Sequence, residues 1–141
     1  MAAGFSWDYE VRWGDQDAFA HVNNKALLAY IEEARVTWLY HHLPDLGENG
    51  SLPAVVNTNI NFRRQLGYPG RVRVEIRAHL ASERRVIHRY VIRDAGDEDI
   101  VYADAECTIV WFDPGTKGST RVPGSLQQQL KGKQASHDPT D

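Results

Sequence analysis

Several features are scarce in this sequence, and each absence excludes a class of protein. Cys107 is the only cysteine among 141 residues, which excludes an internal disulfide and a metal site built from several cysteines. No apolar run approaches the roughly 18 residues of a membrane-spanning helix. The first ten residues contain neither a basic segment nor an apolar one. We therefore expect no secretory signal and a cytoplasmic protein.

The motifs of several large enzyme classes are also missing. The sequence has no Gly-x-Ser-x-Gly elbow, no P-loop and no dinucleotide-binding Gly-x-Gly-x-x-Gly. The pairs His41-His42 and His79/His88 lack the spacing and the neighbouring carboxylates of a metal site. The sequence therefore predicts neither a bound metal nor a redox cofactor.

Lysine is missing from a long stretch in which arginine is abundant. Between Arg63 and Arg93 there are nine arginines, and only Glu75 and Glu83 oppose them. This stretch has a net charge near +7, whereas the whole chain has −3, which argues against nucleic-acid binding. Arginine suits bidentate recognition of phosphate. Two interpretations stay open: a solvated charged face of a sheet, or a surface that binds a phosphate-bearing ligand.

The hydrophobic pattern predicts a single α+β domain. Residues 5–13 alternate as a half-buried strand does, and apolar residues then recur at helical spacing from Asn24 to His41, after Asn23 as a helix N-cap. Four more strand-like runs follow, at residues 54–63, 71–80, 85–93 and 101–111. This order predicts one helix on one antiparallel sheet. A single helix cannot cover both faces of the sheet, so we expect an oligomer.

The alternation also assigns side chains to faces, and the composition sets the domain boundary. One face of the first strand holds Phe5, Trp7, Tyr9, Val11 and Trp13. One face of the second strand holds Ala54, Val56, Thr58, Ile60 and Phe62. Beyond residue 124 the chain is polar and rich in Gln, Lys and Ser. We expect a domain over residues 1–124 and a flexible polar tail over residues 125–141.

The polar segment from residue 14 to residue 24 is the first candidate for chemistry. It places two carboxylates, one imidazole and two asparagine amides between the predicted strand and helix. A carboxylate can act as a nucleophile or as a base for water, and the free amides of a helix start can stabilise an oxyanion. These groups suit acyl transfer from an activated ester. The alternative is architectural, with Asp15 and Asn23 as turn and capping residues and His21 as a hydrogen-bonded structural histidine.

Longer stretches carry a resemblance to a known family. They are Val11 to Asp17, His21 to Asn24 and Tyr30 to Arg35, followed by Asn61 to Arg64 and Tyr102 to Pro114. Together they include the pattern Asp-x-Asp-x-x-x-His-Val-Asn-Asn. In this order they resemble the 4-hydroxybenzoyl-CoA thioesterase family of hotdog proteins over nearly the whole chain.

The resemblance implies a fold, an assembly and an activity. The fold would be the hotdog, a five-stranded antiparallel sheet wrapped around one long helix. The assembly would be a homodimer, often paired into a homotetramer, with its active sites at the dimer interface. The activity would be hydrolysis of an acyl-CoA, or of an acyl group on acyl-carrier protein, with no cofactor beyond the CoA of the substrate.

The resemblance also implies roles for single residues. Asp17 matches the catalytic aspartate, and Asn24 matches the residue whose backbone amide polarises the thioester carbonyl. His21 and Asn23 line the same loop and shape the substrate site. Ala20 departs from the family, because many relatives have glycine at this position. The arginine-rich strands match the region that binds the nucleotide end of CoA, where we expect contacts from Arg63, Arg84 and Arg85.

Two other functions stay open at this stage. A hydratase or dehydratase of acyl thioesters on the same fold uses a carboxylate and a histidine, and Asp17 with His21 imitates that pair. A non-catalytic module would bind CoA esters without cleaving them. The wider motif favours hydrolysis over the hydratase, and the presence of Asp17 fits a non-catalytic module less well.

Overall fold

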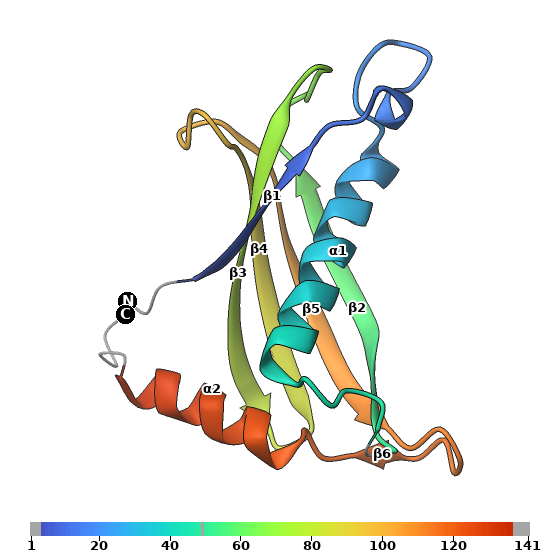
Figure 1. The fold of residues 1–141 in the computed structure, drawn as a ribbon, viewed down its shortest axis with the longest axis vertical. Helices are drawn as coiled ribbons and strands as arrows, with labels where there is room; N and C mark the ends of the chain where they lie inside the picture. The colour runs from blue at the N-terminus through green and yellow to red at the C-terminus, as the bar shows by residue number, and fades with distance from the viewer. Residues whose placement is uncertain (1–3, 49, 137–141) are drawn as a thin grey trace.

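In the computed structural model, which describes residues 4–48 and 50–136, a long helix lies across one face of an antiparallel sheet (Figure 1). The elements are β1 (Phe5–Glu10), η1 (a 3-10 turn, Trp13–Asp15), α1 (Asn24–His42), β2 (Leu52–Phe62), β3 (Arg71–Ser82), β4 (Arg85–Asp94), β5 (Val101–Phe112), β6 (Ser119–Thr120) and α2 (Gly124–Ser136). The strand order is β1-β3-β4-β5-β2, and the short β6 pairs with β5. The predicted α+β class, with five main strands and one long helix, is confirmed.

The hydrophobic core lies between α1 and the sheet. Alternate residues of β3, β4 and β5 are buried against the helix, and α1 contributes apolar side chains at spacings of three and four residues, as its sequence predicts. Trp38 of α1 and Trp111 of β5 are the largest fully buried side chains. No helix among the described residues is long and apolar enough to cross a membrane.

The first strand is shorter than its alternation predicts. β1 ends at Glu10, and Trp13 begins the turn η1 with 74% of its surface exposed. The Asp15 carboxylate accepts a hydrogen bond from the Arg12 backbone N–H at 2.9 Å. This bond turns the chain away from β3, so the prediction that residues 5–13 form one continuous strand is wrong at its end.

A bulge in β2 changes which of its side chains face the helix. The pairing of β2 with β5 shifts register directly after Val55. Val55 and Thr58 both lie opposite buried residues of β5, so both face α1. One extra residue reverses the alternation. The prediction that Ala54 and Val56 share the face of Thr58 is therefore wrong.

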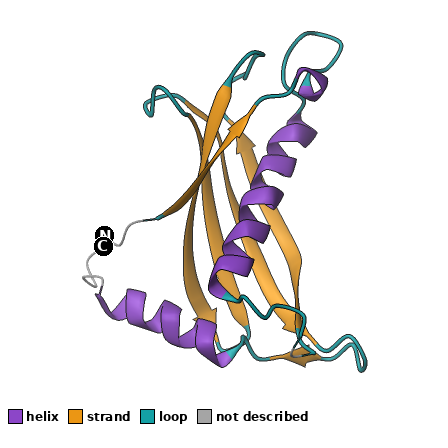
Figure 2. Ribbon diagram, viewed as in Figure 1, coloured by secondary structure: helices purple, strands orange, loops and turns teal. Residues whose placement is uncertain are grey.

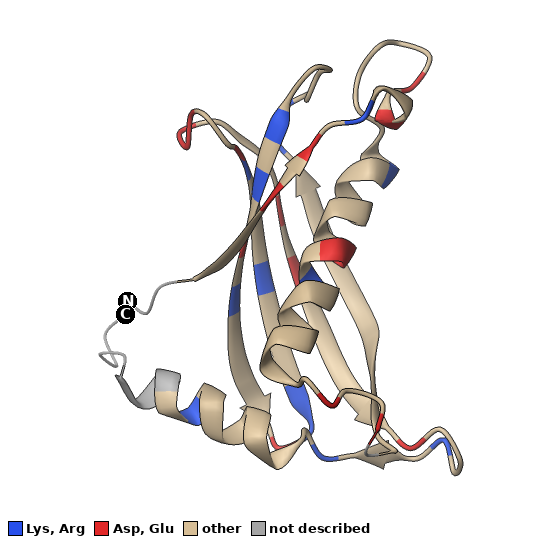
Figure 3. Ribbon diagram, in the orientation of Figure 1, with Lys and Arg blue, Asp and Glu red and all other residues tan. Residues whose placement is uncertain are grey.

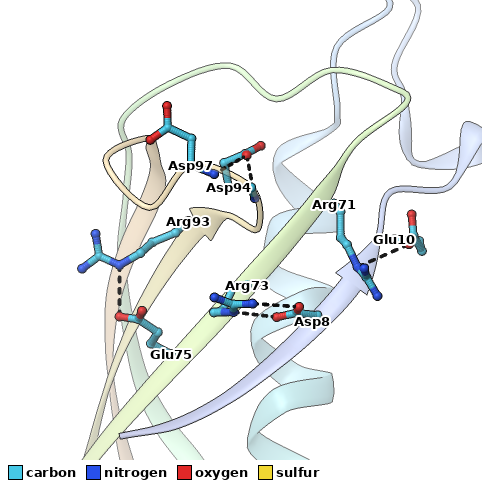
Figure 4. A network of polar contacts seen from close by, with 9 residues as sticks. Asp8, Glu10, Arg71, Arg73, Glu75, Arg93, Asp94 and Asp97 are labelled. Atoms are coloured by element: carbon cyan, nitrogen blue, oxygen red, sulfur yellow. Dashed lines mark hydrogen bonds and ion pairs between the residues drawn. The ribbon is translucent and has the colours of Figure 1, made fainter.

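The arginines of β3 and β4 alternate with the buried residues of these strands, so they lie on the sheet face turned away from α1. Figure 3 shows basic and acidic positions on neighbouring strands. Arg73 and Asp8 lie opposite each other on β3 and β1 and form a two-contact pair at 2.8 and 3.1 Å (Figure 4). Five of the nine arginines have such partners: Arg63–Asp104, Arg71–Glu10, Arg73–Asp8, Arg89–Glu106 and Arg93–Glu75. For these five the charged-face interpretation holds. Pairs of this exposed kind each contribute only about 0–1 kcal/mol to stability.

The structure differs from the flexible tail expected after residue 124. Residues 124–136 form α2, which crosses one end of the sheet (Figure 2). Leu126 and Leu130 lie one turn apart and are 0% and 1% exposed. The Gln129 side-chain amide donates to the His42 carbonyl at 3.1 Å, which ties α2 to the end of α1. Residues 137–141, the rest of the predicted tail, lie outside the described residues.

His88 of β4 makes stability depend on pH. It is fully buried, bonded to the Tyr90 hydroxyl at 2.8 Å and packed edge-on against Trp38. Burial, helped by the charge of Arg35, lowers the pKa of His88 from 6.5 to about 3. The folded state therefore favours the neutral ring. The stability that this preference gives is fully present above the pKa of the unfolded state, near 6.5, and is lost as the pH falls from there toward the pKa of the folded state.

We expect His88 to lower the free energy of unfolding by about 2 kcal/mol between pH 7.5 and pH 5. Urea denaturation at both pH values measures this difference. A His88→Gln variant serves as the reference, because it keeps a polar side chain that does not titrate. Equal pH dependence in the two proteins would contradict a buried neutral His88.

Candidate active site

The predicted catalytic segment lies at the end of the sheet where β2 stops and α1 begins (Figure 1). A cavity of about 550 Å³ opens here between the loop before α1, the first turns of α1 and residues 62–66. Of the predicted site residues, Asp17, His21, Asn24 and Arg63 line this cavity. The structure thus brings together residues that lie up to 46 positions apart in the sequence.

Asp17 is exposed and held by its own loop. Its Oδ1 accepts hydrogen bonds from the Phe19 N–H at 2.8 Å and the His21 N–H at 3.3 Å. The Asp17 N–H donates to the His21 carbonyl at 2.8 Å and closes the loop. Within the described residues Oδ2 accepts no hydrogen bond. One carboxylate oxygen is therefore fixed while the other is available to a substrate or a water molecule.

The start of α1 presents a backbone donor to the same cavity. Asn23 is the N-cap, and its side chain accepts from the Lys25 N–H at 3.0 Å. The N–H of Asn24, the first residue of the helix, donates to no group in the described part of the chain. Such free amides at a helix start carry positive partial charge. Asn24 therefore offers a donor for a carbonyl oxygen. Asn23 instead caps the helix and does not line the cavity.

Asp15 supports the loop from inside the protein. The Tyr30 hydroxyl donates to its Oδ2 at 2.6 Å, and the Arg12 side chain reaches its Oδ1 at 3.1 Å. Burial alone would raise the pKa of Asp15, but the bonds from Tyr30 and Arg12 outweigh it and hold the pKa below its ordinary value. Its carbonyl also accepts from the Asn23 N–H at 2.8 Å. Asp15 thus joins the loop before α1 to the helix cap.

Ala20 has a left-handed backbone, with φ +60°, where an alanine costs about 1–2 kcal/mol that glycine does not. This explains why glycine suits the position. We expect Ala20→Gly to raise the free energy of unfolding by about 0.5–1 kcal/mol. The backbone strain that glycine relieves is larger than the free-energy cost of the greater freedom that glycine gives the unfolded chain. Urea denaturation at pH 7.5 measures it.

A matched control for that variant is Ala29→Gly on the exposed side of α1. There the backbone is helical, so the same change should lower stability by about 1 kcal/mol. A loss of stability in both variants would show that Ala20 is not strained.

The three arginines expected at the site lie at opposite ends of the sheet. Arg63 lines the cavity, but its guanidinium is paired with Asp104 at 2.7 and 3.3 Å. Arg64 lines the same cavity and forms no ion pair with the described residues. Arg84 and Arg85 lie at the β3–β4 turn, at the other end of the sheet (Figure 1). Within one chain the structure therefore does not bring Arg84 or Arg85 near Asp17.

Arg64 is the cavity residue that the sequence did not single out. In the sequence it is one of nine arginines, and only its place at the cavity beside Asp17 distinguishes it from Arg84 and Arg85. Among the described residues, no group of three or more His, Cys, Asp or Glu side chains is arranged to hold a metal.

Comparisons with solved structures find the same fold in other proteins. A protein of Pseudomonas aeruginosa described as a proposed thioesterase is 29% identical, with a TM-score of 0.82 over 89% of this chain and 96% of that one. A proposed acyl-CoA thioesterase of Xanthomonas campestris is 30% identical, with a TM-score of 0.74 over 84% of this chain and 98% of that one. A Staphylococcus aureus protein solved in complex with CoA is 13% identical, with a TM-score of 0.85 over 96% of this chain and 86% of that one.

None of the curated proteins compared matches this sequence. The model of the thioesterase-like superfamily matches residues 11–130, which include the loop before α1, α1 itself, all main strands after β1, and the first half of α2. This range and the shared architecture confirm the resemblance to hotdog thioesterases. The chain therefore belongs to the thioesterase-like superfamily.

Proposed function

We propose that the protein hydrolyses acyl-CoA thioesters to a carboxylic acid and free CoA. The observation that carries this proposal is the meeting of two groups at one cavity: the open oxygen of the Asp17 carboxylate and the free Asn24 N–H. A thioester needs these two functions, a donor for its carbonyl oxygen and a base or nucleophile for its carbonyl carbon.

The Asn24 N–H would donate to the thioester carbonyl and stabilise the oxyanion that forms. In the general-base route, Asp17 takes a proton from water, the hydroxyl adds to the carbonyl carbon, and the carbon–sulfur bond breaks. The leaving thiolate then receives the proton from Asp17. In the nucleophilic route, Asp17 attacks the carbonyl carbon and forms a mixed anhydride as the carbon–sulfur bond breaks and the CoA thiolate leaves. Water then cleaves the anhydride, which regenerates the Asp17 carboxylate, releases the acid and supplies the proton for the thiolate. Both routes use the oxygen that the loop leaves open.

Arg64 is the residue that we expect to bind the CoA phosphates. It lines the cavity and has no carboxylate partner among the described residues, whereas Arg63 would have to give up Asp104 to bind an anion. Arg84 and Arg85 would contact the same CoA only from another subunit. Acyl-carrier protein presents the same phosphopantetheine arm, so an acyl group on that carrier is the alternative substrate.

A homodimer formed through the β2 edge would complete the site. β2 pairs with β5 on one side only, and unpaired strand edges require a cover. Exposed apolar side chains gather beside this edge on α1 and β2, which marks an interaction surface. They are Leu28, Val36, Tyr40, Val55, Val56 and Phe62. Pairing two such edges would place the cavity at the dimer interface.

Two assays on purified protein separate hydrolysis from the hydratase alternative. With a conjugated enoyl-CoA, a hydratase removes the absorbance of the double bond and leaves the thioester intact. We expect release of free thiol with the double bond retained. Loss of the double bond without thiol release would identify a hydratase, and the absence of both would support a binding module.

A further inference from the structure

The inner face of β2 is only partly covered by its own helix. Val55, Thr58 and Phe62 lie opposite buried residues of β5, so they point to the side of the sheet on which α1 lies. All three are nevertheless exposed, with 38% of Val55 and 43% of Phe62 accessible to water. α1 and β2 run in opposite directions along this open seam (Figure 1). Because β2 is also an edge strand of the sheet, a second chain can reach this face.

α1 presents a stripe of side chains beside this seam at intervals of four residues. Leu28, Val36 and Tyr40 of the stripe are apolar and 40–55% exposed. Glu32 lies among them, and its side chain is 69% exposed. Arg35 borders the same seam together with Glu32 and Val36. Exposed apolar side chains that gather on one surface mark a contact with another molecule, and here they surround one acid and one base.

Arg35 is a strongly buried cation with weak pairing. Its side chain is 14% exposed, and within the described chain its one carboxylate contact is Glu32, at 3.9 Å. The five arginines that pair with carboxylates of neighbouring strands are more exposed and yet lie at only 2.7–3.4 Å from them. A distance of 3.9 Å is too long for a hydrogen bond. A buried charge needs a close opposite charge, and the chain alone does not supply one to Arg35.

The groups on the inner side of Arg35 do not replace a carboxylate. Its Nη1 contacts the Cys107 sulfur, a weak acceptor, at 3.6 Å. Burial raises the pKa of Tyr90 far above neutrality, so its hydroxyl stays protonated. His88 is neutral as well, since burial lowers its pKa to about 3. The charge that Arg35 lacks must therefore come from the open side of the seam.

We propose that Arg35 pairs with Glu32 of a second copy of this chain, and that two such pairs set the register of the homodimer on which the proposed function rests. An interface with two-fold symmetry uses the same patch of both chains. Each Arg35 then meets the partner's Glu32, and each Glu32 meets the partner's Arg35. The guanidinium of arginine suits this role, because it binds a carboxylate through two parallel hydrogen bonds.

The spacing along α1 fits this arrangement. Leu28 and Tyr40, the ends of the stripe, are centred on residue 34, and Glu32 and Arg35 are centred within one residue of it. Two antiparallel copies of α1 that share this centre place Arg35 within about 1.5 Å of the level of the partner's Glu32. Leu28 then lies level with the partner's Tyr40, so the apolar ends of the two stripes cover each other.

Reversing either charge should dissociate the dimer. In Glu32→Arg two arginines meet at each contact, and in Arg35→Glu two glutamates meet. We expect the dimer Kd, measured by sedimentation equilibrium, to rise by about a hundredfold or more in each variant. Glu32→Arg changes an exposed position, so it decides the question even if Arg35→Glu does not fold. Arg89→Glu, which reverses one charge of the pair with Glu106 at 3.0 Å, is the matched control and should stay dimeric.

Mixing the two variants separates this pairing from a general loss of the interface. One chain of Glu32→Arg offers two arginines and one chain of Arg35→Glu offers two glutamates, so a dimer of one of each regains both ion pairs. We expect a heterodimer at concentrations at which each variant alone is monomeric, identified by its mass in native mass spectrometry. Thiol release from an acyl-CoA should return on mixing, because the proposed site lies at the dimer interface.

The possible outcomes separate the pairing from the dimer and from the activity. A Glu32→Arg protein with the wild-type Kd would overturn the pairing and leave the homodimer intact. Two folded monomeric variants that do not combine would overturn the pairing as well. A monomeric wild type would overturn both the pairing and the homodimer. A dimeric wild type that releases no thiol would overturn the proposed function, and sedimentation would still decide on the pairing.

Discussion

Replacing Asp17 by asparagine should lower kcat for thioester hydrolysis by about a thousandfold or more. Asparagine keeps the oxygen that accepts from the Phe19 and His21 amides, so the loop should keep its shape. It lacks the negative charge needed to attack the thioester or to take a proton from water. Thiol release measures the loss. Circular dichroism and CoA calorimetry should give wild-type values.

A matched control for this variant is Asp113→Asn. Asp113 holds a turn in the same way, since its Oδ1 accepts from the Gly115 N–H at 2.7 Å and the Thr116 N–H at 3.2 Å. It lies outside the residues that line the active-site cavity. Asp113→Asn should retain full activity. An active Asp17→Asn protein would remove Asp17 from the mechanism.

Truncating Leu126 to alanine should lower the free energy of unfolding by about 2–5 kcal/mol. Leu126 is fully buried where α2 meets the core, and its removal leaves a cavity beside Leu130. Urea denaturation followed by tryptophan fluorescence measures the change, because Trp38 and Trp111 report on the same core.

The comparison for this variant is Gln128→Ala, on the exposed side of the same helix. It should change the free energy of unfolding by less than about 0.5 kcal/mol. If Leu126→Ala were as mild as Gln128→Ala, α2 would contribute nothing to the domain and a flexible tail would describe it better.

Local periodicity explains which elements could be predicted from the sequence. α1, β3, β4 and β5 each bury one face against a single core, so burial leaves a regular pattern in their residues. The bulge after Val55 left no such sign, because one extra residue in β2 looks like continued alternation. Among the α2 side chains that the structure describes, only Leu126 and Leu130 mark the buried side, and the many glutamines around them gave the segment the composition of a tail.

The arginines could not be placed from the sequence for a different reason. Arg73 meets Asp8, which lies 65 residues away, and strand order decides this contact. The sequence from Arg63 to Arg93 therefore predicted an excess of positive charge. In the structure, carboxylates of neighbouring strands neutralise most of that excess. Asp17 and Asn24 could be predicted together because the loop and the helix start are adjacent in the chain.

Thiol release by the purified wild-type protein from short, long, branched, aromatic and carboxylate-ended acyl-CoAs tests the central claim most directly. The proposed function predicts that at least one class yields free CoA and carboxylic acid in equal amounts, and that Asp17→Asn abolishes both. No thiol release from any class, with CoA binding intact, would contradict hydrolysis and leave a CoA-ester-binding module.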